Sequence, residues 1–174
     1  MLLVPYDPSW PQRFEEFATS IRAAGAEEWI IEHIGSTAIP GMSAKPVIDL
    51  AVRVETGEQF GVRSSALEEA GWRIGSGVRT HPVMIRESAG ERLAIAHFFP
   101  VAEWHLAPQR LLQDWLRAHP ADAERYERAK HDAARAAADG VSSYNAGKTA
   151  VIQEIVNSAR AARGLEPVDV YDKR

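Results

Sequence analysis

An acidic residue lies inside an apolar run of this chain, at Asp49 within residues 46–54. A carboxylate in such a run is costly to bury unless it is paired or binds a metal ion. Residues 47, 49 and 51 of a strand share one face, so the side chains of Asp49 and Ala51 point the same way. The run therefore predicts a buried strand with one functional carboxylate. A structural Asp that accepts hydrogen bonds from loop amides is the alternative.

The loop in front of this strand is rich in hydrogen-bond donors. It begins with Gly35, which lets the backbone approach a ligand closely, and Ser36, which offers a hydroxyl and an N–H group. Further donors and a second glycine follow at Thr37, Gly41, Ser43 and Lys45. We expect this loop to bind a phosphate group beside Asp49, and an ordinary Gly-Ser turn is the alternative. The phosphate contacts would come from Gly35, Ser36, Thr37 and Lys45.

Two more candidates lie later in the chain. His97 stands in an otherwise apolar run over 93–99, and Lys148 follows Tyr144 by four residues on one face of a predicted helix. Both could reach a phosphate group, whereas a hydrogen-bonded histidine and a solvated lysine are the simpler alternatives. The six histidines show no metal-ligand spacing, so we expect no zinc site. Charges such as Glu127 and Lys130 fit a solvated helix face.

The pattern of apolar, capping and turn residues predicts the order of helices and strands. A first helix is expected to start near residue 10 and end at Gly25, and a second spans 57–71. Strands are expected at 29–34, 46–54, 72–74, 83–86 and 93–99, with a turn at 87–90. Three helices over 103–119, 121–139 and 142–163 follow. This order predicts an α+β fold, a mixed β-sheet flanked by helices with a helical C-terminal part.

Length and composition set further limits. At 174 residues we expect one domain over 1–164 and a loosely held tail over 165–174. The chain has no cysteine, which excludes disulfides and thiolate metal sites and suits a reducing compartment. No apolar run approaches the roughly 20 residues of a membrane span, and the first residues do not resemble a signal peptide. We therefore expect a cytoplasmic protein with no membrane partner.

The charge balance restricts the kind of partner. A net charge of −4 argues against general nucleic-acid binding, because neutralising phosphates needs clustered Lys and Arg. A small phosphorylated ligand needs only a local set of donors, so that class stays open. A protein partner also stays open, since no motif identifies one.

Several motifs taken together resemble the GrpB family over roughly residues 4–156. They lie at residues 5–10, 32–37, 40–41, 44–46, 48–49, 116–120, 126, 130 and 144–148. That family resembles the nucleotidyltransferase superfamily, which has the polymerase-β-like fold. The resemblance implies a small mixed sheet, a Gly-Ser motif that holds a nucleoside triphosphate, and acids that hold Mg²⁺ for in-line attack on the α-phosphorus. GrpB-like segments also occur fused to dephospho-CoA kinase, which implies an accessory role.

Carried over to this chain, the resemblance makes Gly35 and Ser36 phosphate contacts and Asp49 the catalytic metal ligand. Lys45, His97 and Lys148 would stabilise charge. Ala51 stands where a second acid is expected, and the later strand offers only His97. Two functions follow: Mg²⁺-dependent nucleotidyl transfer to an unknown acceptor, or a catalytically impaired accessory module that binds a nucleotide or phosphometabolite. A scaffold whose cleft is a relic is a third alternative.

Overall fold

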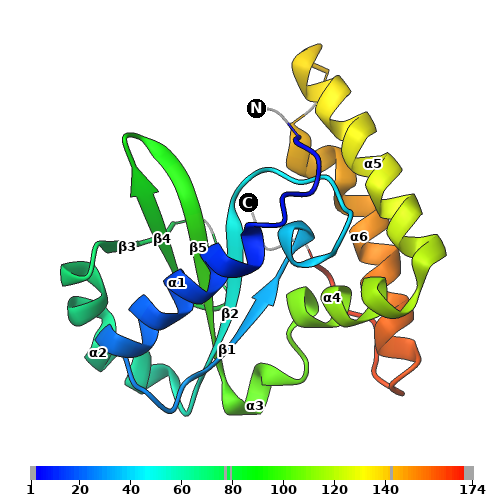
Figure 1. Cartoon of the computed structure of the whole chain (residues 1–174). Coiled ribbons are helices and arrows are strands. Elements are labelled where there is room, and N and C mark those ends of the chain that lie inside the picture. Colours follow the sequence, from blue (N-terminus) through cyan, green and yellow to red (C-terminus); the bar gives the residue numbers. More distant parts are fainter. Residues whose placement is uncertain (1–2, 77, 79, 142, 171–174) are drawn as a thin grey trace.

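The protein is seen in a computed structural model that describes residues 3–76, 78, 80–141 and 143–170. Its strands form one sheet, with helices in front of it and a group of three helices beside it (Figure 1). The strands are β1 (Ile30–Ile34), β2 (Ile48–Val54), β3 (Trp72–Ile74), β4 (Val83–Ser88) and β5 (Glu91–Pro100). The helices are α1 (Trp10–Ala24), η1 (Ser36–Ala38), α2 (Gly57–Glu69), α3 (Val101–Trp104), α4 (Pro108–Ala118), α5 (Pro120–Ala138) and α6 (Tyr144–Ala161).

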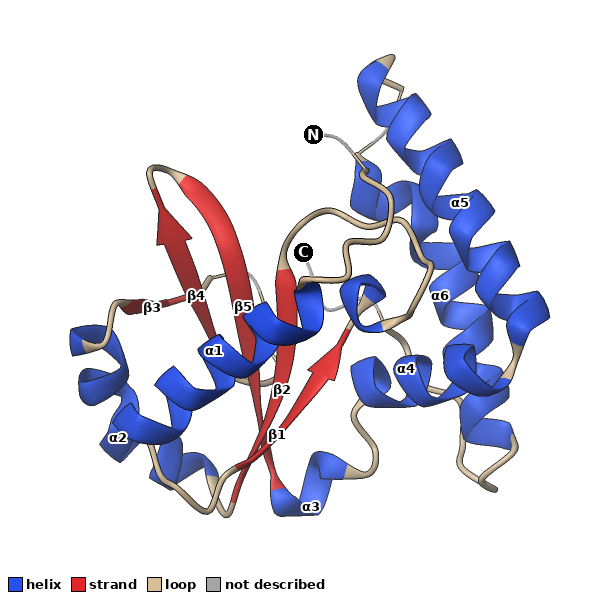
Figure 2. Cartoon of the chain, in the orientation of Figure 1, coloured by secondary structure: helices blue, strands red, loops and turns tan. Residues whose placement is uncertain are grey.

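The sheet is mixed, with strand order β1-β2-β5-β4-β3. Strands β2 and β5 are parallel, and the other three pairs are antiparallel. Helix α2 lies between β2 and β3 in the chain, and α4, α5 and α6 stand together next to the β1 side of the sheet (Figure 2). This arrangement confirms the predicted α+β fold with a helical C-terminal part.

The two faces of β2 have different surroundings because successive side chains of a strand alternate. Ile48, Leu50 and Val52 are fully buried in the main core of the protein. Residues of α1 at helical spacing, Trp10, Phe14, Ala18 and Ile21, belong to the same core. The apolar face of α1 therefore covers one face of the sheet and leaves the other face for Asp49 and Ala51.

The second face of β2 carries a smaller apolar cluster around Ala51. Ala51 has 0% exposure and clusters with Ile34, Phe99, Trp104 and Ala107. These residues come from β1, β5, α3 and the link to α4. The position expected for a second acid is therefore filled by an apolar contact.

Most element boundaries lie within one or two residues of those expected, and two of the expected elements differ more clearly. The single helix expected over 103–119 is two helices, because Ala107 is extended and Pro108 begins α4 at its first turn. Strands β4 and β5 extend to a tight turn at Ala89 and Gly90, since Glu87 pairs with Arg92. The chain after α6 lies along that helix, where Asn157 Oδ1 accepts a hydrogen bond from the N–H of Val168 at 3.1 Å.

No helix formed by the described residues combines the length and the apolar character that a membrane span needs.

A buried carboxylate should be tolerated poorly at position 51. We expect Ala51→Asp to lower the free energy of unfolding by about 3–5 kcal/mol, because the new charge would be buried among Ile34, Phe99 and Trp104. Urea denaturation measures this loss. Val62→Asp is the control, since Val62 is 79% exposed on α2 and should change stability by less than about 1 kcal/mol. Equal stability of the two variants would contradict the burial of Ala51.

Candidate functional site

The candidate site begins where β1 ends and the Gly-Ser turn starts. Ile34 is paired with Asp49 across the β1–β2 ladder, so the next residue, Gly35, lies against the Asp49 side chain. Gly35 has φ +74°, and a Cβ built there would be 2.5 Å from Asp49 Oδ2. Glycine is therefore required at position 35 both for its backbone angle and for the close approach of the carboxylate.

Thr37 is held inside the fold rather than at the surface. Its side chain is 1% exposed, and its Oγ1 lies 3.0 Å from His33 Nε2. The same hydroxyl donates a hydrogen bond to the carbonyl oxygen of Val47, at 3.4 Å. His33 and Thr37 thus connect the end of β1, the Gly-Ser turn and the start of β2, and they fix the shape of the loop around Asp49.

His33 has an environment that disfavours its charged form. Burial and, to a smaller extent, the charge of Arg117 together lower its pKa from 6.5 to about 4. Its ring stacks on Phe14 of α1, with ring centroids 4.9 Å apart. His33 is therefore a neutral histidine at neutral pH, and its Nε2–H is the natural donor to Thr37.

The cations of the site come from the loop and from α6. Helix α6 starts at Tyr144 because the Ser143 side chain accepts a hydrogen bond from the N–H of Ala146. Lys45 Nζ lies 3.6 Å from the centroid of the Tyr144 ring, and Lys148 Nζ lies 4.6 Å from it. Burial lowers the pKa of Lys148, and the charge of Asp49 raises it. The structure thus brings Lys45 and Lys148 together around Tyr144, and the charge of Asp49 acts on Lys148.

Helix α5 adds two residues that the sequence analysis did not place in the site. Burial raises the pKa of Tyr126 to about 12, and a side-chain hydrogen bond with Ser36 opposes this rise. Lys130 has 0% exposure, so the solvated helix face expected for it is wrong. Its Nζ donates to the Ser43 carbonyl and lies 2.7 Å from Glu127 Oε2. The four-residue spacing of Tyr126 and Lys130 was the signal for a shared face.

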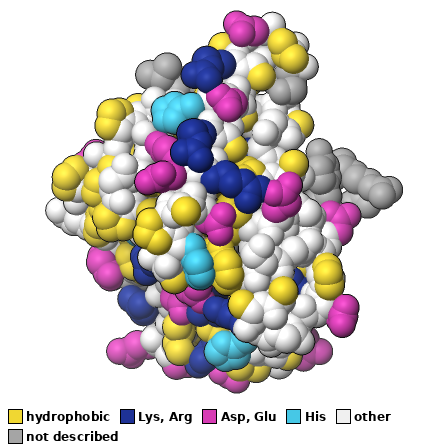
Figure 3. Space-filling model, turned by 90° about the vertical axis from the view of Figure 1, so that its right-hand side faces the viewer, with side chains coloured by type: hydrophobic (Ala, Val, Ile, Leu, Met, Phe, Trp, Pro, Cys, Tyr) yellow, Lys and Arg dark blue, Asp and Glu magenta, His cyan; other side chains and the backbone are white. Residues whose placement is uncertain are grey.

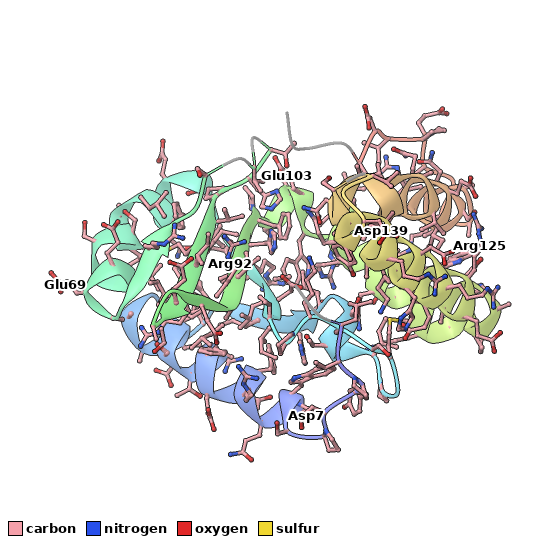
Figure 4. The ribbon with its side chains drawn as sticks, turned by 90° about the horizontal axis from the view of Figure 1, so that it is seen from above. Asp7, Glu69, Arg92, Glu103, Arg125 and Asp139 are labelled. Atoms are coloured by element: carbon pink, nitrogen blue, oxygen red, sulfur yellow. The ribbon has the colours of Figure 1, made fainter. Side chains whose placement is uncertain are left out.

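Helix α5 carries different residues on its two sides, and Figure 4 shows the molecule from above with Arg125 of this helix labelled. The sheet lies on one side of the view and α4–α6 on the other, and the labelled Arg125 points outward from the helices. Its neighbour Tyr126 is buried and reaches Ser36. One face of α5 therefore closes over the Gly-Ser turn, while the other carries the solvated charges.

His97 lies on the same face of the sheet as Asp49, but it is level with Ala51, two residues further along β2. Its pairing partner in β2 is Ala51, while Asp49 pairs with Ile95. His97 Nδ1 lies 2.8 Å from His81 Nε2, and His81 Nδ1 lies 2.8 Å from Thr80 Oγ1. The imidazole of His97 therefore belongs to a chain of hydrogen bonds on the β4 side of the face.

The acids near Asp49 determine how many metal ions the site could hold. Glu32 is opposite Ala51, but Arg110 donates to both of its carboxylate oxygens at 2.7 and 2.8 Å. Arg110 also stacks on Trp104, 3.9 Å from the ring centroid. Within the part of the chain that the structure describes, no three His, Cys, Asp or Glu side chains are grouped to hold a metal. Asp49 could hold one Mg²⁺ together with phosphate oxygens.

Two cavities lie along β1, which is an edge strand of the sheet. They have volumes of about 470 and 280 Å³, and Phe14, His33 and Arg117 line both. The larger one also contacts Thr37, so it adjoins the back of the Gly-Ser turn.

The close approach at Gly35 can be tested against a second glycine of the same loop. Gly41 also has a positive φ, +80°, but nothing lies within 4 Å of a Cβ built there. We expect Gly35→Ala to lower the free energy of unfolding by at least about 1 kcal/mol more than Gly41→Ala, because only Gly35→Ala adds a clash to the backbone strain. Thermal and urea denaturation measure the stability of both variants. Equal losses of unfolding free energy would contradict the close contact between Gly35 and Asp49.

The low pKa of His33 makes stability depend on pH. The pKa of His33 in the folded protein, about 4, lies below the ordinary value of 6.5. Between pH 4 and pH 6.5 the unfolded chain therefore binds more protons at this residue than the folded protein does. The contribution of His33 to stability should therefore be complete above pH 6.5 and be lost as the pH falls towards 4. Nuclear magnetic resonance titration gives the pKa, and His33→Gln should remove this part of the pH dependence. A midpoint near 6.5 would contradict the buried, neutral ring.

Sequence comparison identifies the family. The family pattern described as GrpB protein matches residues 1–158. A UPF0157 protein of Pseudomonas aeruginosa is 38% identical over 167 residues, which cover 92% of this chain and 68% of that protein. The dephospho-CoA kinase of Mycobacterium bovis is 30% identical over a region that covers 78% of this chain but 40% of the kinase.

Structure comparison agrees with the sequence. The crystal structure of the conserved protein GrpB from Enterococcus faecalis has a TM-score of 0.81 and 27% identity, and the match covers 94% of this chain and 99% of that one. Terminal uridylyl transferase 4 from Trypanosoma brucei, solved with bound dUTP, has a TM-score of 0.58 at 12% identity, over 93% of this chain and 56% of that one. At this identity the second match concerns the fold alone. The chain therefore belongs to the GrpB family and has a nucleotidyltransferase-like fold.

Proposed function

We propose that this protein binds a nucleoside triphosphate between the Gly-Ser turn and α6, and transfers its nucleoside monophosphate to an acceptor that is still unknown. One observation carries the proposal: the Asp49 carboxylate lies against the backbone of Gly35, and its charge raises the pKa of Lys148 on α6. A glycine turn, a carboxylate and an ammonium group are the groups that a phosphate chain with a bound divalent cation needs. The similar fold of the uridylyl transferase with bound dUTP supports this assignment.

Each side chain has a role that follows from its chemistry. Gly35 and Ser36 offer backbone N–H groups and a hydroxyl to the phosphates, and Thr37 keeps the turn in shape. Lys45 and Lys148 balance the phosphate charge. Asp49 would hold Mg²⁺, which supplies Lewis-acid polarisation of a phosphoryl oxygen when bound. His97 lies on the same face and would contact the part of the substrate nearest Ala51.

The reaction would be an in-line displacement at the α-phosphorus. A bond forms from an acceptor oxygen to phosphorus, the bond to the bridging oxygen breaks, and pyrophosphate leaves. Such transfer depends mainly on positioning and on stabilising charge. Gly35 and Ser36 would orient the phosphate chain, and Lys148 would stabilise the charge that grows on the leaving pyrophosphate.

A binding module without catalysis is the second candidate function. The observation that favours it is the apolar cluster around Ala51, together with the ion pair that engages Glu32. Catalysis by two metal ions needs carboxylates that bridge them, and these positions do not offer such carboxylates. The similarity to part of a dephospho-CoA kinase supports an accessory role beside another protein.

We also propose that the protein is cytoplasmic. The absence of cysteine from its sequence supports this location, because it suits a reducing compartment.

Calorimetric titration with ATP, GTP, CTP and UTP, each with and without Mg²⁺, tests the proposed site. We expect Asp49→Asn to weaken Mg²⁺–triphosphate binding by at least about tenfold, because the carboxylate is the ligand for the ion. Asp132→Asn is the matched control, since Asp132 is two-thirds exposed on α5 and pairs with Arg135. Failure of all four nucleotides to bind, or equal affinities of the two variants, would overturn the proposed site.

Release of pyrophosphate separates the two candidate functions. The protein would be incubated with the triphosphate that binds and with an extract of cellular metabolites and proteins. Pyrophosphate that forms with the wild type but not with Asp49→Asn supports the transferase. Tight binding of the nucleotide without pyrophosphate release in any fraction supports the binding module.

A further inference from the structure

The larger of the two cavities along β1 lies between segments that are far apart in the sequence. It has a volume of about 470 Å³, and its walls come from the segment before α1, from α1, β1 and η1, and from α4. Sites for small molecules usually have about 300–1,000 Å³. Neither Asp49 nor Lys148 is among the described residues that line this cavity, so the proposed phosphate site does not occupy it. The cavity has the size for a second ligand.

Much of the wall of this cavity is apolar and aromatic. It includes Tyr6, Pro11, Phe14 and Pro40, and Phe14 is 9% exposed. The Phe14 ring is stacked on the ring of His33, with an angle of 3° between the two planes. Aromatic rings pack well against such surfaces in offset stacks and edge-to-face pairs. The wall therefore suits a ligand that carries an aromatic ring.

A cationic side chain, Arg117 of α4, stands at the cavity. It is exposed, and it lines both the larger cavity and the smaller one. Its Nη2 donates a hydrogen bond to the carbonyl oxygen of Ala38 at 2.9 Å, which holds the side chain against η1. Among the residues that the structure describes, no carboxylate forms an ion pair with Arg117. Because a guanidinium group has five N–H donors, Arg117 keeps donors for an anionic ligand.

The acidic side chains that line the cavities leave the charge of Arg117 in place. Glu32 and Asp114 are paired with other arginines, at 2.7 and 3.0 Å. Glu15 is exposed on α1, where water and salt screen its charge. The charge of Arg117 contributes to the low pKa of His33, so the wall that the two cavities share has a positive potential.

His33 adds a hydrogen-bond acceptor to this wall. Its Nε2–H donates to Thr37, so Nδ1 of the neutral ring carries a lone pair. Within the part of the chain that the structure describes, this Nδ1 has no hydrogen-bond partner. A hydroxyl group on the ring of a ligand is a suitable donor to it. The cavity thus combines an apolar wall, a cation and an acceptor.

We propose that the larger cavity is a second binding site, which takes a small aromatic acid with its carboxylate on Arg117 and its ring against the apolar wall beside Phe14. A carboxylate and a guanidinium group can form two parallel hydrogen bonds, which fix the orientation of the ligand. This inference goes beyond the proposed function, because it concerns a different ligand and different residues.

The probe is para-hydroxyphenylacetate, which carries a carboxylate, an aromatic ring and a hydroxyl group. Calorimetry would measure its binding to the full chain beside that of para-hydroxyphenylacetamide, which lacks the charge, and of acetate, which lacks the ring. We expect the acid to bind at least about tenfold more tightly than either, because each of the other two loses one of the interactions. The ring signals of His33 in nuclear magnetic resonance spectra should shift as the acid binds.

Variants of Arg117 locate the carboxylate. We expect Arg117→Gln to weaken binding of the acid by at least about tenfold, and Arg117→Lys, which keeps the charge, to weaken it less. Arg128→Gln is the matched control, since the Arg128 side chain is 69% exposed on α5. Its affinity for the acid should equal that of the wild type. Figure 3 shows basic and acidic side chains interspersed over the side of the molecule that it presents, so loss of one exposed arginine leaves a mixed surface.

Several outcomes would overturn the second site. They are failure of the acid to bind, equal affinities for the acid and its amide, and equal losses in Arg117→Gln and Arg128→Gln. A loss in Lys148→Gln as large as that in Arg117→Gln would place the probe in the phosphate site and would overturn the proposal as well. Circular dichroism would confirm that each variant is folded. Nucleotide binding plays no part in this test, so this proposal and the proposed function can fail separately.

Discussion

The pairing of β1 with β2 is the contact on which the candidate site depends. These strands are antiparallel, and their register places Ile34 opposite Asp49. A shift by one residue would turn Asp49 towards the core and move Leu50 to the site. The register is fixed because Ile48, Leu50 and Val52 must face α1. Packing on one side of the sheet thereby determines the chemistry that is available on the other.

The face that carries Asp49 is divided between two kinds of surroundings. Next to Gly35 the strand is open to hydroxyl, phenol and ammonium groups of the loop, α5 and α6. Two residues further along β2, at Ala51, the same face of the strand is covered by apolar side chains and by the Glu32–Arg110 ion pair. This division restricts charge to one end of the strand. It also explains how a nucleotidyltransferase-like fold is compatible with alanine at position 51 beside the half-buried Asp49.

Much of the fold could be predicted from local patterns, and less of the site could. The apolar run in 46–54 and the helical spacing of apolar residues after Trp10 predicted β2 and α1, because both patterns reflect burial. The GrpB resemblance and the nucleotidyltransferase-like fold are confirmed. The burial of Lys130 was missed, since a charge on a helix is exposed unless a distant segment covers it, and Ser43 belongs to such a segment. The roles of Gly35, Ser36, Thr37, Lys45, Asp49, His97 and Lys148 in binding stay predictions.

The site lies at the boundary between two parts of the chain that are synthesised at different times. Asp49 and the Gly-Ser turn belong to the sheet, whereas Tyr126, Lys130, Tyr144 and Lys148 belong to the last two helices. A nascent chain that has formed its sheet therefore carries Asp49 before Lys148 of α6 has been synthesised. A ligand that touches both parts would act as a tie between them, and its binding energy would add to the cohesion of the whole domain.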